Sequence, residues 1–493
     1  MNRIQSNTTP IILTGKHFFL DDDCACPDSP QIFTSLQDTF ENDCACPSAD
    51  SADLANLLPA DNRLYKQADS IYRDDLSSDF RLAFSPYAPQ GPSVLNLSAW
   101  ERWQNFAQPR PLSQPEDAIL AQQNLIMPVT APARLPTPIP EMLTAWMHVT
   151  NACNLDCPYC YVRKSSASMT EEIGLNAIGK IFQTASKRQF KNVKLKYAGG
   201  EATLQFRLLK KLAEHAEQLS QEYGLGLKQV ILSNGTRITV QDAAWMLENN
   251  LRLMISLDGV GEIHDRTRPY RNGNGSFDAV RRTIDEVLLP GGLSPMITVT
   301  ITQQNAGGAA DAVRWALERD LSVSLNFYRH KPDSAEDLAA EENTLIDGML
   351  AAYQVYEEVL PLRPFLNGLL DRTQAGGHLH TCGVGSSYLV INHEGALAQC
   401  QMQLDAPVSR ALTDDLLLQV HNGPLKNISV EEKQNCNTCT YRYRCAGGCP
   451  LETYRASGRW DVSSPNCHIY KTLFPHAFRL EGLRLLKMHG WLN

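Results

Sequence analysis

Six short apolar runs alternate with amphipathic stretches between Ala145 and Arg329. The runs are AWMHVT, VKLKYA, QVILS, LRLMISLD, MITVTIT and VSLNFYR, and each is typical of a buried strand. The stretches between them, such as TEEIGLNAIGKIFQTASKRQ and LLKKLAEHAEQLSQEY, have apolar residues at helical spacing. Strands that alternate with helices form a parallel sheet through right-handed crossovers. We therefore expect an α/β domain at residues 141–335. Six βα units predict a partial, TIM-like barrel, because a full eight-unit barrel needs about 250 residues.

The regions on either side of this domain have different patterns. Residues 1–60 are acidic and rich in Ser, Asp and Pro, and we expect them to form a weakly ordered arm. Residues 61–140 predict a small α+β unit with a hairpin at FRLAFSPYAPQGPSVLNL, a helix capped by Ser98 and a Pro-rich linker. The remaining predicted parts are a helical bridge at 336–375, a loop-rich, cysteine-rich domain at 376–475 and a C-terminal helix at 476–493.

The composition is that of an ordinary globular protein, with 43% hydrophobic and 20% charged residues. A net charge of -9 and the lack of a dense Lys/Arg tract argue against nucleic acid or an anionic membrane as the main partner. The N-terminus has no apolar segment long enough for a signal peptide. No apolar run reaches the roughly 18 residues of a membrane span. We therefore expect a cytoplasmic protein.

The 14 cysteines fall in three groups along the chain. In a reducing compartment, clustered cysteines are more often metal or cluster ligands, or catalytic groups, than disulfides. The first group is a pair of CACP motifs, the second is a triad in NACNLDCPYCY, and the third has seven members between 382 and 467. The sequence has no cysteine between 160 and 382, which is not the distribution expected of scattered core cysteines.

The twin CACP motifs contain Cys24, Cys26, Cys44 and Cys46. They allow several interpretations: redox-active pairs, metal ligands, a tethered substrate-like segment, a site of self-modification, or an arm with reduced, exposed thiols. Thiols separated by one residue are sterically poor partners for a disulfide. The other interpretations stay open.

The triad consists of Cys153, Cys157 and Cys160, directly after the first predicted strand. Three thiolates on one tight loop can ligate three irons of a [4Fe–4S] cube and leave one iron open for a small molecule. The loop resembles that of the radical S-adenosylmethionine (SAM) superfamily, C-x3-C-x-aromatic-C, with Tyr159 in the aromatic position. The resemblance implies that SAM chelates the open iron through its amine and carboxylate. The alternative is a zinc loop or a loop of buried thiols.

Further motifs follow the second and third predicted strands, and barrel ligands bind at such strand ends. In YAGGEATL, Gly199 and Gly200 can let the backbone approach a ligand, and Glu201 can accept from an ammonium group. This segment resembles the GGE motif of the same superfamily, which implies contact with the SAM amino group. In ILSNGT, Ser233 and Asn234 are expected at the rim.

The segment after the fourth predicted strand, ISLDGVGEIHDRTRP, is rich in polar residues. Its resemblance to related maturases implies that Ser256 and Arg268 contact the SAM ribose and carboxylate. His264 and Asp265 either take part in the site or only organise the loop.

The C-terminal cysteines follow the pattern C-x12-G-x4-C, then C-x2-C-x5-C-x3-C, with a last cysteine 17 residues further on. This spacing resembles the SPASM domain, which extends a radical SAM barrel with two auxiliary [4Fe–4S] clusters. The resemblance assigns the distal cluster to Cys436, Cys439, Cys445 and Cys467, and the nearer one to Cys382, Cys400 and Cys449. An eighth cysteine of some relatives is missing, so the nearer cluster has an open iron or another cap, for which His378 and His380 are candidates. The alternative is a zinc ribbon.

The hairpin-then-helix order of residues 61–140 is similar to a winged-helix element that recognises peptides in many peptide-modifying radical SAM enzymes. There a leader peptide adds a strand to the sheet edge, a mode that needs only main-chain donors and acceptors. The alternative is a structural cap on the barrel.

Together these resemblances predict a radical SAM/SPASM maturase with SAM and three [4Fe–4S] clusters, one that binds SAM and two auxiliary. They imply that an electron from a flavodoxin- or ferredoxin-like donor cleaves SAM to a 5′-deoxyadenosyl radical, which takes hydrogen from a precursor peptide or protein. The product is expected to be a thioether or C–C crosslink or an oxidised side chain. The alternatives are a sulfatase-type maturase that makes formylglycine, an enzyme acting on a small molecule, and a non-catalytic iron–sulfur or zinc module.

Overall fold

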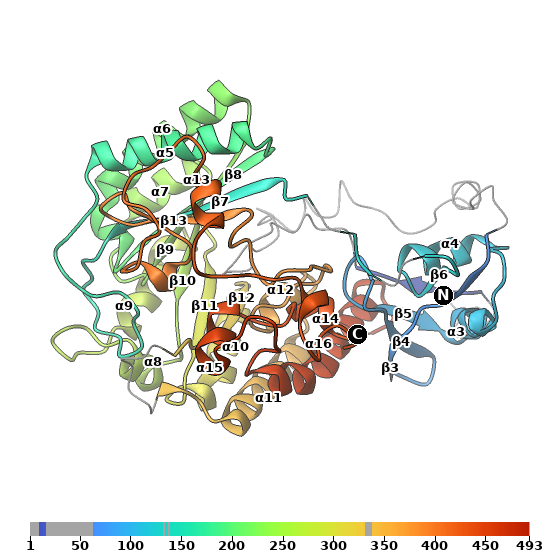
Figure 1. Ribbon diagram of the computed structural model, residues 1–493. Coiled ribbons are helices and arrows are strands. Elements are labelled where there is room, and N and C mark those ends of the chain that lie inside the picture. Colours follow the sequence, from blue (N-terminus) through green and yellow to red (C-terminus); the bar gives the residue numbers. More distant parts are fainter. Residues whose placement is uncertain (1–8, 16–62, 132–133, 137–138, 331–337, 493) are drawn as a thin grey trace.

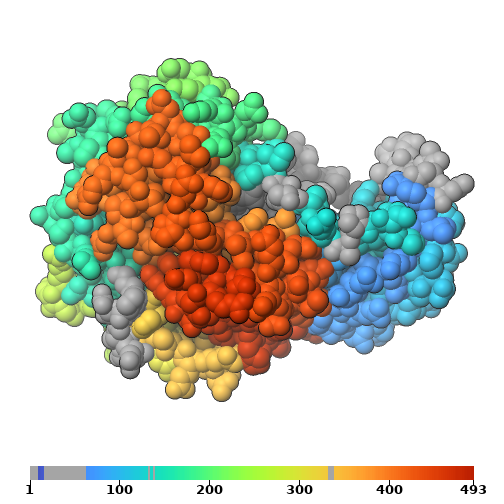
Figure 2. Space-filling view, in the orientation of Figure 1, coloured from blue at the N-terminus to red at the C-terminus, as the bar shows by residue number. Residues whose placement is uncertain are grey.

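The structure is a computed structural model that describes residues 9–15, 63–131, 134–136, 139–330 and 338–492 (Figure 1). A central sheet with helices around it forms the largest part of the molecule. The C-terminal segments, orange and red, cover one side of this part, and the blue N-terminal unit lies beside the C-terminal helix (Figures 1 and 2).

The predicted row of six parallel strands is confirmed. The strands are β7 (Met142–Thr150), β8 (Asn192–Gly199), β9 (Gly226–Ser233), β10 (Leu251–Ser256), β11 (Met296–Ile301) and β12 (Val323–Phe327). They lie in sequence order, and each pairs in parallel with the next. Every residue of β7 is buried, as expected of a strand covered on both faces. The carboxyl ends of the six strands therefore lie along one edge, and the polar motifs follow them there.

The crossover helices coincide with the predicted amphipathic stretches. They are α5 (Glu171–Lys187), α6 (Phe206–Tyr223), α7 (Val240–Glu248), α9 (Phe277–Arg282) and α10 (Ala309–Leu317), and a short helix α8 (Glu262–Thr267) precedes α9. The Thr170 side chain caps α5 by accepting from the N–H of Ile173. Helix α6 ends at Gly224, whose φ of 64° is accessible to glycine at no steric cost.

The sheet continues beyond these six strands into the predicted C-terminal domain. Strand β13 (Tyr388–Ile391) pairs in parallel with β7, and β14 (Leu397–Ala398) pairs antiparallel with β13. The result is an eight-stranded sheet. The cysteine-rich domain is therefore attached to the same strand that leads into the cysteine triad.

The N-terminal unit is built on a four-stranded sheet in the order β1-β5-β4-β3. The strands are β1 (Ile12–Leu13), β3 (Tyr72–Asp75), β4 (Phe80–Phe84) and β5 (Ser93–Asn96); β2 (Tyr65–Gln67) pairs with β6 (Ile126–Pro128), and the helices are α3 (Leu97–Gln104) and α4 (Pro115–Gln122). The predicted hairpin is the antiparallel pair β4–β5.

The prediction that Ser98 caps the next helix is wrong. Strand β5 runs straight into α3, so the Asn96 side chain accepts from the N–H of Ala99 at 2.9 Å.

Most of the acidic N-terminal arm, including Cys24, Cys26, Cys44 and Cys46, lies outside the described residues. Within the arm, the short segment at residues 9–15 is described, and its strand β1 pairs with β5 at the edge of the N-terminal sheet.

The chain ends in a long helix that contacts all other parts. The bridge contains α11 (Glu342–Val359) and α12 (Leu366–Leu369), and α16 (Cys467–Met488) follows the cysteine-rich loops. Helix α16 begins at Cys467, well before the predicted start at 476, and Pro475 lies inside it. It packs on α11 and on the N-terminal sheet, where the rings of Phe84 and Phe478 are 4.2 Å apart. Among the helices of the described residues, none is long and apolar enough to span a membrane.

Candidate active site

The cysteine triad lies on the loop that leaves the carboxyl end of β7. Cys153, Cys157 and Cys160 are all partly exposed there. The loop is held against the barrel by Asp156, whose N–H donates to the carbonyl of Pro269 at 2.8 Å. Burial raises the pKa of the Cys157 thiol to about 11. Such a thiol keeps its proton until a cation replaces it, which is what binding to a cluster iron does.

The carboxylate of Glu201 brings two neighbouring strand ends together. Glu201 is 1% exposed. Its Oε1 accepts from the Ser233 hydroxyl at 2.9 Å, and its Oε2 accepts from the N–H of Asn234 at 2.6 Å. The N–H and the hydroxyl of Thr203 also donate to Oε1. Three of the predicted site residues therefore contact one another directly.

The two glycines before Glu201 lie close to the chain's own backbone. A Cβ on Gly200 would lie 2.5 Å from the carbonyl oxygen of Ala152, and one on Gly199 would lie 2.6 Å from that of Thr150. The N–H of Gly200 donates to Thr150, and that of Glu201 donates to Ala152, at 2.7 and 2.8 Å. The close approach is thus to the chain's own backbone just before the triad. The GGE motif holds the start of the cysteine loop in place.

The side chain of Asn234 touches the same loop from the end of β9. Its Nδ2 donates to Asn154 Oδ1 at 2.8 Å and lies 3.9 Å from the sulfur of Cys153. Its Oδ1 accepts from the N–H and the hydroxyl of Thr236. These bonds fix the amide so that its N–H group faces the cysteine sulfur. A donor in that orientation favours a thiolate over a thiol.

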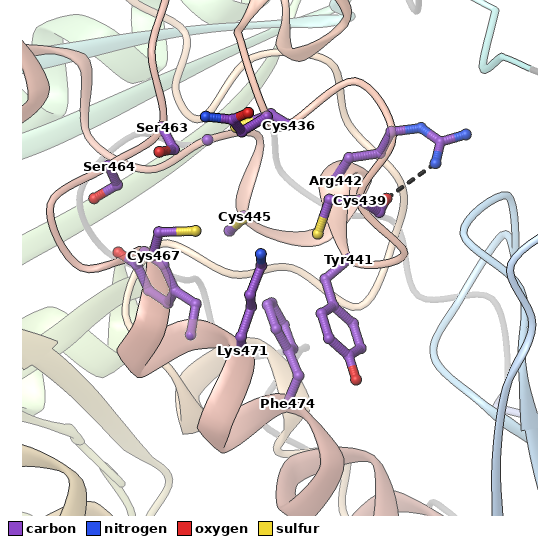
Figure 3. A pocket seen from close by; sticks show the side chains of 13 residues that line it. Cys436, Cys439, Tyr441, Arg442, Cys445, Ser463, Ser464, Cys467, Lys471 and Phe474 are labelled. Carbon is purple, nitrogen blue, oxygen red and sulfur yellow. Dashed lines mark hydrogen bonds between the residues drawn. The ribbon is translucent and has the colours of Figure 1, made fainter.

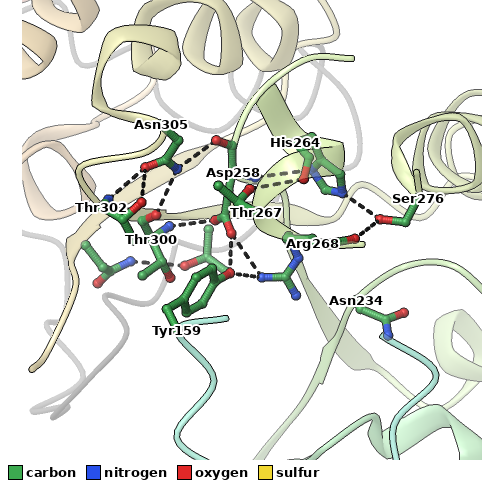
Figure 4. Close-up of polar contacts among 12 residues, drawn as sticks. Tyr159, Asn234, Asp258, His264, Thr267, Arg268, Ser276, Thr300, Thr302 and Asn305 are labelled. Atoms are coloured by element: carbon green, nitrogen blue, oxygen red, sulfur yellow. Dashed lines mark hydrogen bonds and ion pairs between the residues drawn. The ribbon is translucent and has the colours of Figure 1, made fainter. Parts of the chain in front are cut away.

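A buried polar group joins the triad loop to the end of β10 (Figure 4). The Tyr159 hydroxyl donates to Asp258 Oδ2, and Arg268 Nη1 donates to the same hydroxyl. Arg268 Nη1 also lies 3.2 Å from Asp258 Oδ2, with 10% and 0% of these two side chains exposed. Asp258 Oδ1 accepts from the N–H of Thr300 on β11. We call Tyr159, Asp258 and Arg268 the rim triplet.

One donor of the rim triplet has no partner within the described part of the chain. The Nε of Arg268 is buried and makes no hydrogen bond there. A buried guanidinium N–H without an acceptor is costly, so an oxygen of a bound ligand is the natural partner. The observed donor set therefore fits a carboxylate- or hydroxyl-bearing ligand such as SAM. Ser256, the other residue predicted here, ends β10 and is partly exposed at the same edge.

His264 and Asp265 organise the loop after β10. His264 Nδ1 accepts from the N–H of Asp258 at 3.3 Å, and its Nε2 lies 3.1 Å from the Ser276 hydroxyl. That hydroxyl donates to the carbonyl of Arg268 at 2.6 Å. Burial lowers the pKa of His264 to about 3, so the ring is neutral and Nε2 carries its proton. Asp265 Oδ1 accepts from the N–H of Phe277.

The distal cysteine set surrounds a cavity with an empty volume of about 350 Å³, its open mouth included. Figure 3 shows the sulfurs of Cys436, Cys439, Cys445 and Cys467 around this space, with the Lys471 ammonium turned into it. Across the described residues, no three His, Cys, Asp or Glu side chains converge closely enough to hold a single metal ion. Four thiols around a volume fit a cube-shaped cluster, which takes one thiolate per iron.

The nearer set lies between the cysteine-rich loops and the barrel. Cys382, Cys400 and Cys449 belong to one apolar cluster together with Trp146 of β7 and Tyr388 of β13. Asn427 Nδ2 donates to the carbonyl of Cys382 and lies 3.6 Å from its sulfur. The predicted set is therefore brought together at the point where the sheet continues into the C-terminal domain.

The two histidines considered as caps lie on the distal side of these loops. The N–H of His378 donates to the carbonyl of Tyr443, between two distal cysteines in the sequence. Burial lowers the pKa of His378 to about 4 and also lowers that of His380. Both rings are therefore neutral near pH 7.

Comparisons with known proteins agree with this geometry. The model of the Radical SAM superfamily matches residues 147–302. The AdoMet-dependent heme synthase of Oleidesulfovibrio alaskensis is 30% identical over 368 residues, which are 68% of this chain and 89% of that protein. The chain belongs to the radical SAM superfamily. The radical SAM chain is thus an enzyme that uses SAM and [4Fe–4S] chemistry, as its sequence predicts.

Other relatives match about two thirds of this radical SAM enzyme. The mycofactocin maturase MftC of Mycolicibacterium smegmatis is 25% identical to it. The matched residues are 65% of this chain and 81% of MftC. The serine-type anaerobic sulfatase-maturating enzyme of Klebsiella aerogenes is 22% identical. The matched residues are 68% of this chain and 84% of that enzyme. The solved structure of native anSMEcpe with bound AdoMet and Cp18Cys peptide has a TM-score of 0.58 at 20% identity and covers 71% of this chain and 99% of that one. This likeness confirms the predicted fold.

The sequence did not reveal the partners that hold these site residues. Asp258 stands in a polar loop with several acidic residues, and no local pattern distinguishes it as the partner of Tyr159, 99 positions earlier. Asn154 and Thr236 bind Asn234 through side chains that are equally common in solvent-exposed turns. One sequence signal could have identified Asp258 as a site residue. It stands two residues after a buried strand, where the ends of parallel strands meet.

Proposed function

We propose that this radical SAM enzyme is a maturase that removes hydrogen from a peptide or protein substrate and installs a crosslink or an oxidised side chain. The observation that carries the proposal is strand β1, an extended segment held at the edge of the N-terminal sheet. Relatives named as maturases, MftC and the sulfatase-maturating enzyme, support it.

The contacts of β1 are those of a peptide bound through its main chain. Ile12 and Leu13 pair antiparallel with β5. Asn96, at the end of β5, donates from its N–H to the carbonyl of Ile11 at 3.1 Å and from Nδ2 to the carbonyl of Thr9 at 2.8 Å. Its Oδ1 accepts from the N–H of Ile11 at 2.9 Å. This edge therefore accepts an extended segment, and strand addition is a general mode of peptide recognition.

We propose the following cluster ligands, which follow the resemblance of the sequence and the grouping of the thiols. The SAM-binding cluster takes Cys153, Cys157 and Cys160; the distal auxiliary cluster takes Cys436, Cys439, Cys445 and Cys467; the nearer one takes Cys382, Cys400 and Cys449. When bound, SAM and its cluster supply a carbon radical that takes hydrogen from the substrate. A flavodoxin- or ferredoxin-like protein is the proposed source of the electron.

The chain's own residues orient SAM and exclude water. In the proposal, Glu201 accepts from the SAM ammonium, because its Oε2 accepts from one donor among the described residues, the N–H of Asn234, and a carboxylate oxygen accepts about two. Arg268 donates from Nε to the SAM carboxylate or ribose while the rest of its guanidinium stays bound to Asp258 and Tyr159. Ser256 stands at the same edge, as a further contact for the ribose. The buried positions of Glu201 and Arg268 strengthen both interactions.

The test uses anaerobically purified enzyme with SAM, dithionite and a candidate precursor peptide. We expect 5′-deoxyadenosine to form and the peptide mass to fall by about two hydrogens for each crosslink. Formation of 5′-deoxyadenosine with an unchanged peptide argues against that peptide. Formation of heme from a heme precursor in the same assay would establish the second candidate, a small-molecule substrate, which the 30% identity to the heme synthase favours.

A further inference from the structure

A lysine lies buried between the two auxiliary cysteine sets. Lys433 stands three residues before Cys436, and its side chain is 0% exposed. Its Nζ donates to the carbonyl of Ala446 at 3.0 Å. Lysine is seldom fully buried without a partner of opposite charge. No carboxylate takes that place among the hydrogen bonds and ion pairs of Lys433 in the described part of the chain.

The turn that receives Lys433 joins the two sets. It runs from Cys445, in the distal set, to Cys449, in the nearer set. Ala446, Gly447 and Gly448 have φ values of 43°, 78° and 73°, three consecutive left-handed residues. A Cβ on Gly447 would lie 2.5 Å from Cδ and 2.8 Å from Nζ of Lys433, so glycine is required for the lysine to fit.

A second contact comes to this turn from the nearer set. The Thr381 hydroxyl, directly before Cys382, lies 2.7 Å from the carbonyl of Gly448 and 3.0 Å from that of Ala446. Ala446 thus receives Thr381 from one side and Lys433 from the other. The ammonium group therefore lies at the junction of both sets and not inside either one.

The groups that act electrostatically on Lys433 are cysteines of both sets, namely Cys436, Cys445, Cys382 and Cys449. Burial lowers the pKa of Lys433, and thiolates at these four positions raise it. Ligation makes each of these cysteines a thiolate, and reduction adds a further negative charge to a cluster. A positive charge at this place is favoured by both clusters and favours their reduced states.

Resting on the cluster ligands proposed above, we propose that Lys433 is a positive charge shared by both auxiliary [4Fe–4S] sites, where it raises both reduction potentials. Lys433 is a positioning residue, because it acts on the reaction through the clusters. Raising both potentials makes each site a better acceptor for an electron that leaves the substrate. The neighbouring Lys471 differs, since it lines the distal cavity and acts on Cys436 and Cys467 there.

The test measures the reduction potentials of both auxiliary clusters by an EPR-monitored redox titration. The full chain carries Cys153→Ala, Cys157→Ala and Cys160→Ala, so that the auxiliary clusters alone report. In this background we compare Lys433→Met, Lys433→Gln, Lys433→Arg and Lys471→Met, each with its iron and sulfide content. We expect the Met and Gln variants of Lys433 to shift both potentials to more negative values and Lys433→Arg to keep them. We expect Lys471→Met to shift the distal potential alone.

Unchanged potentials in Lys433→Gln with full iron content would overturn the shared charge. If the Met and Gln variants lose iron while Lys433→Arg retains iron and potentials, the positive charge is needed to assemble both sites, which supports the proposal. Loss of iron in Lys433→Arg as well would show that a positive charge at this position is not sufficient to retain the clusters, and the proposal fails. If the background protein itself holds no auxiliary iron, the ligand assignment of the proposed function fails instead.

Discussion

The cysteine triad loop and the C-terminal cysteines are stabilised by different kinds of contact. The triad loop is fixed by side-chain hydrogen bonds to strand ends, through the rim triplet and the bonds of Asn234. The C-terminal cysteines lie among short helices and loops, where buried cations donate to backbone carbonyls. Arg444, for example, is 1% exposed and donates to the carbonyl of Ala88 at 2.6 Å.

This difference indicates which region depends on its metal clusters for structure. The triad loop leaves a barrel with a continuous apolar core, so we expect the loop to keep its position when iron is absent. Of the C-terminal cysteines, Cys445 packs against this core, whereas Cys382, Cys400, Cys436 and Cys449 belong to smaller apolar clusters. We expect the proposed auxiliary clusters to contribute directly to folding there, as metals do in small metal-stabilised domains.

The largest expected effect comes from removing the triad. Replacing Cys153, Cys157 and Cys160 with Ala should abolish 5′-deoxyadenosine formation, because no site for the SAM-binding cluster remains. The auxiliary-cluster absorbance near 400 nm, on the order of two clusters per chain, should persist. Chromatography of the reaction and iron analysis check both points. Residual SAM cleavage in this variant would contradict the triad's proposed role.

The next largest effect should come from a distal ligand. Cys445→Ala removes one thiolate and, with it, the structure that the distal cluster stabilises. We expect faster hydrogen exchange throughout the C-terminal loops and unchanged exchange in β8 and β9. The triple-Ala variant is the matched control and should leave hydrogen exchange in the C-terminal loops unchanged. Equal protection of the C-terminal loops in wild type and Cys445→Ala would remove the distinction between the two regions.

A smaller effect is expected from Tyr159→Phe. It deletes the hydroxyl between Asp258 and Arg268, a loss of about 1–3 kcal/mol for a buried charged hydrogen bond, or roughly tenfold in SAM affinity. Anaerobic calorimetry measures the affinity. Tyr328→Phe is the control, because the Tyr328 hydroxyl is buried without a partner among the described residues. Equal SAM affinity in the two variants would show that the rim triplet does not position Arg268.

The smallest effect should come from Asn96→Ala. The change removes the cap of α3 and the side-chain bonds to β1, about 1 kcal/mol. We expect faster hydrogen exchange of Ile12 and Leu13 with little change in global stability. Asn96→Asp retains the cap acceptor but loses the donor to Thr9, so it separates the two roles. Unchanged exchange of β1 in both variants would show that Asn96 does not hold the strand.

The sequence predicted elements that are defined by local patterns. The six barrel strands and their helices follow from periodicity, and the cysteine spacings follow from motifs shorter than 35 residues, as the span from Cys436 to Cys467 illustrates. The N-cap of α3 was predicted two residues too late, because Ser98 and Asn96 are both good caps and only the register of β5 decides between them.

Contacts between distant segments could not be predicted in this way. Strand β13 has four residues and joins β7 from more than 200 positions away, and neither partner encodes that pairing locally. Lys433 is one of many lysines in the sequence, and its place between two cysteine sets follows from the turn at Gly447. Such partners are chosen by burial and shape, which emerge only when the domains have assembled.

Helix α16 has a mechanical consequence for the whole molecule. Its 22 residues make a rod about 33 Å long. Cys467 stands at its first position, and near its other end Gly482 lies so close to the N-terminal sheet that an added Cβ would be 2.8 Å from Leu82. One continuous helix therefore joins the N-terminal sheet, whose edge carries β1, to the cysteine at the far end of the rod.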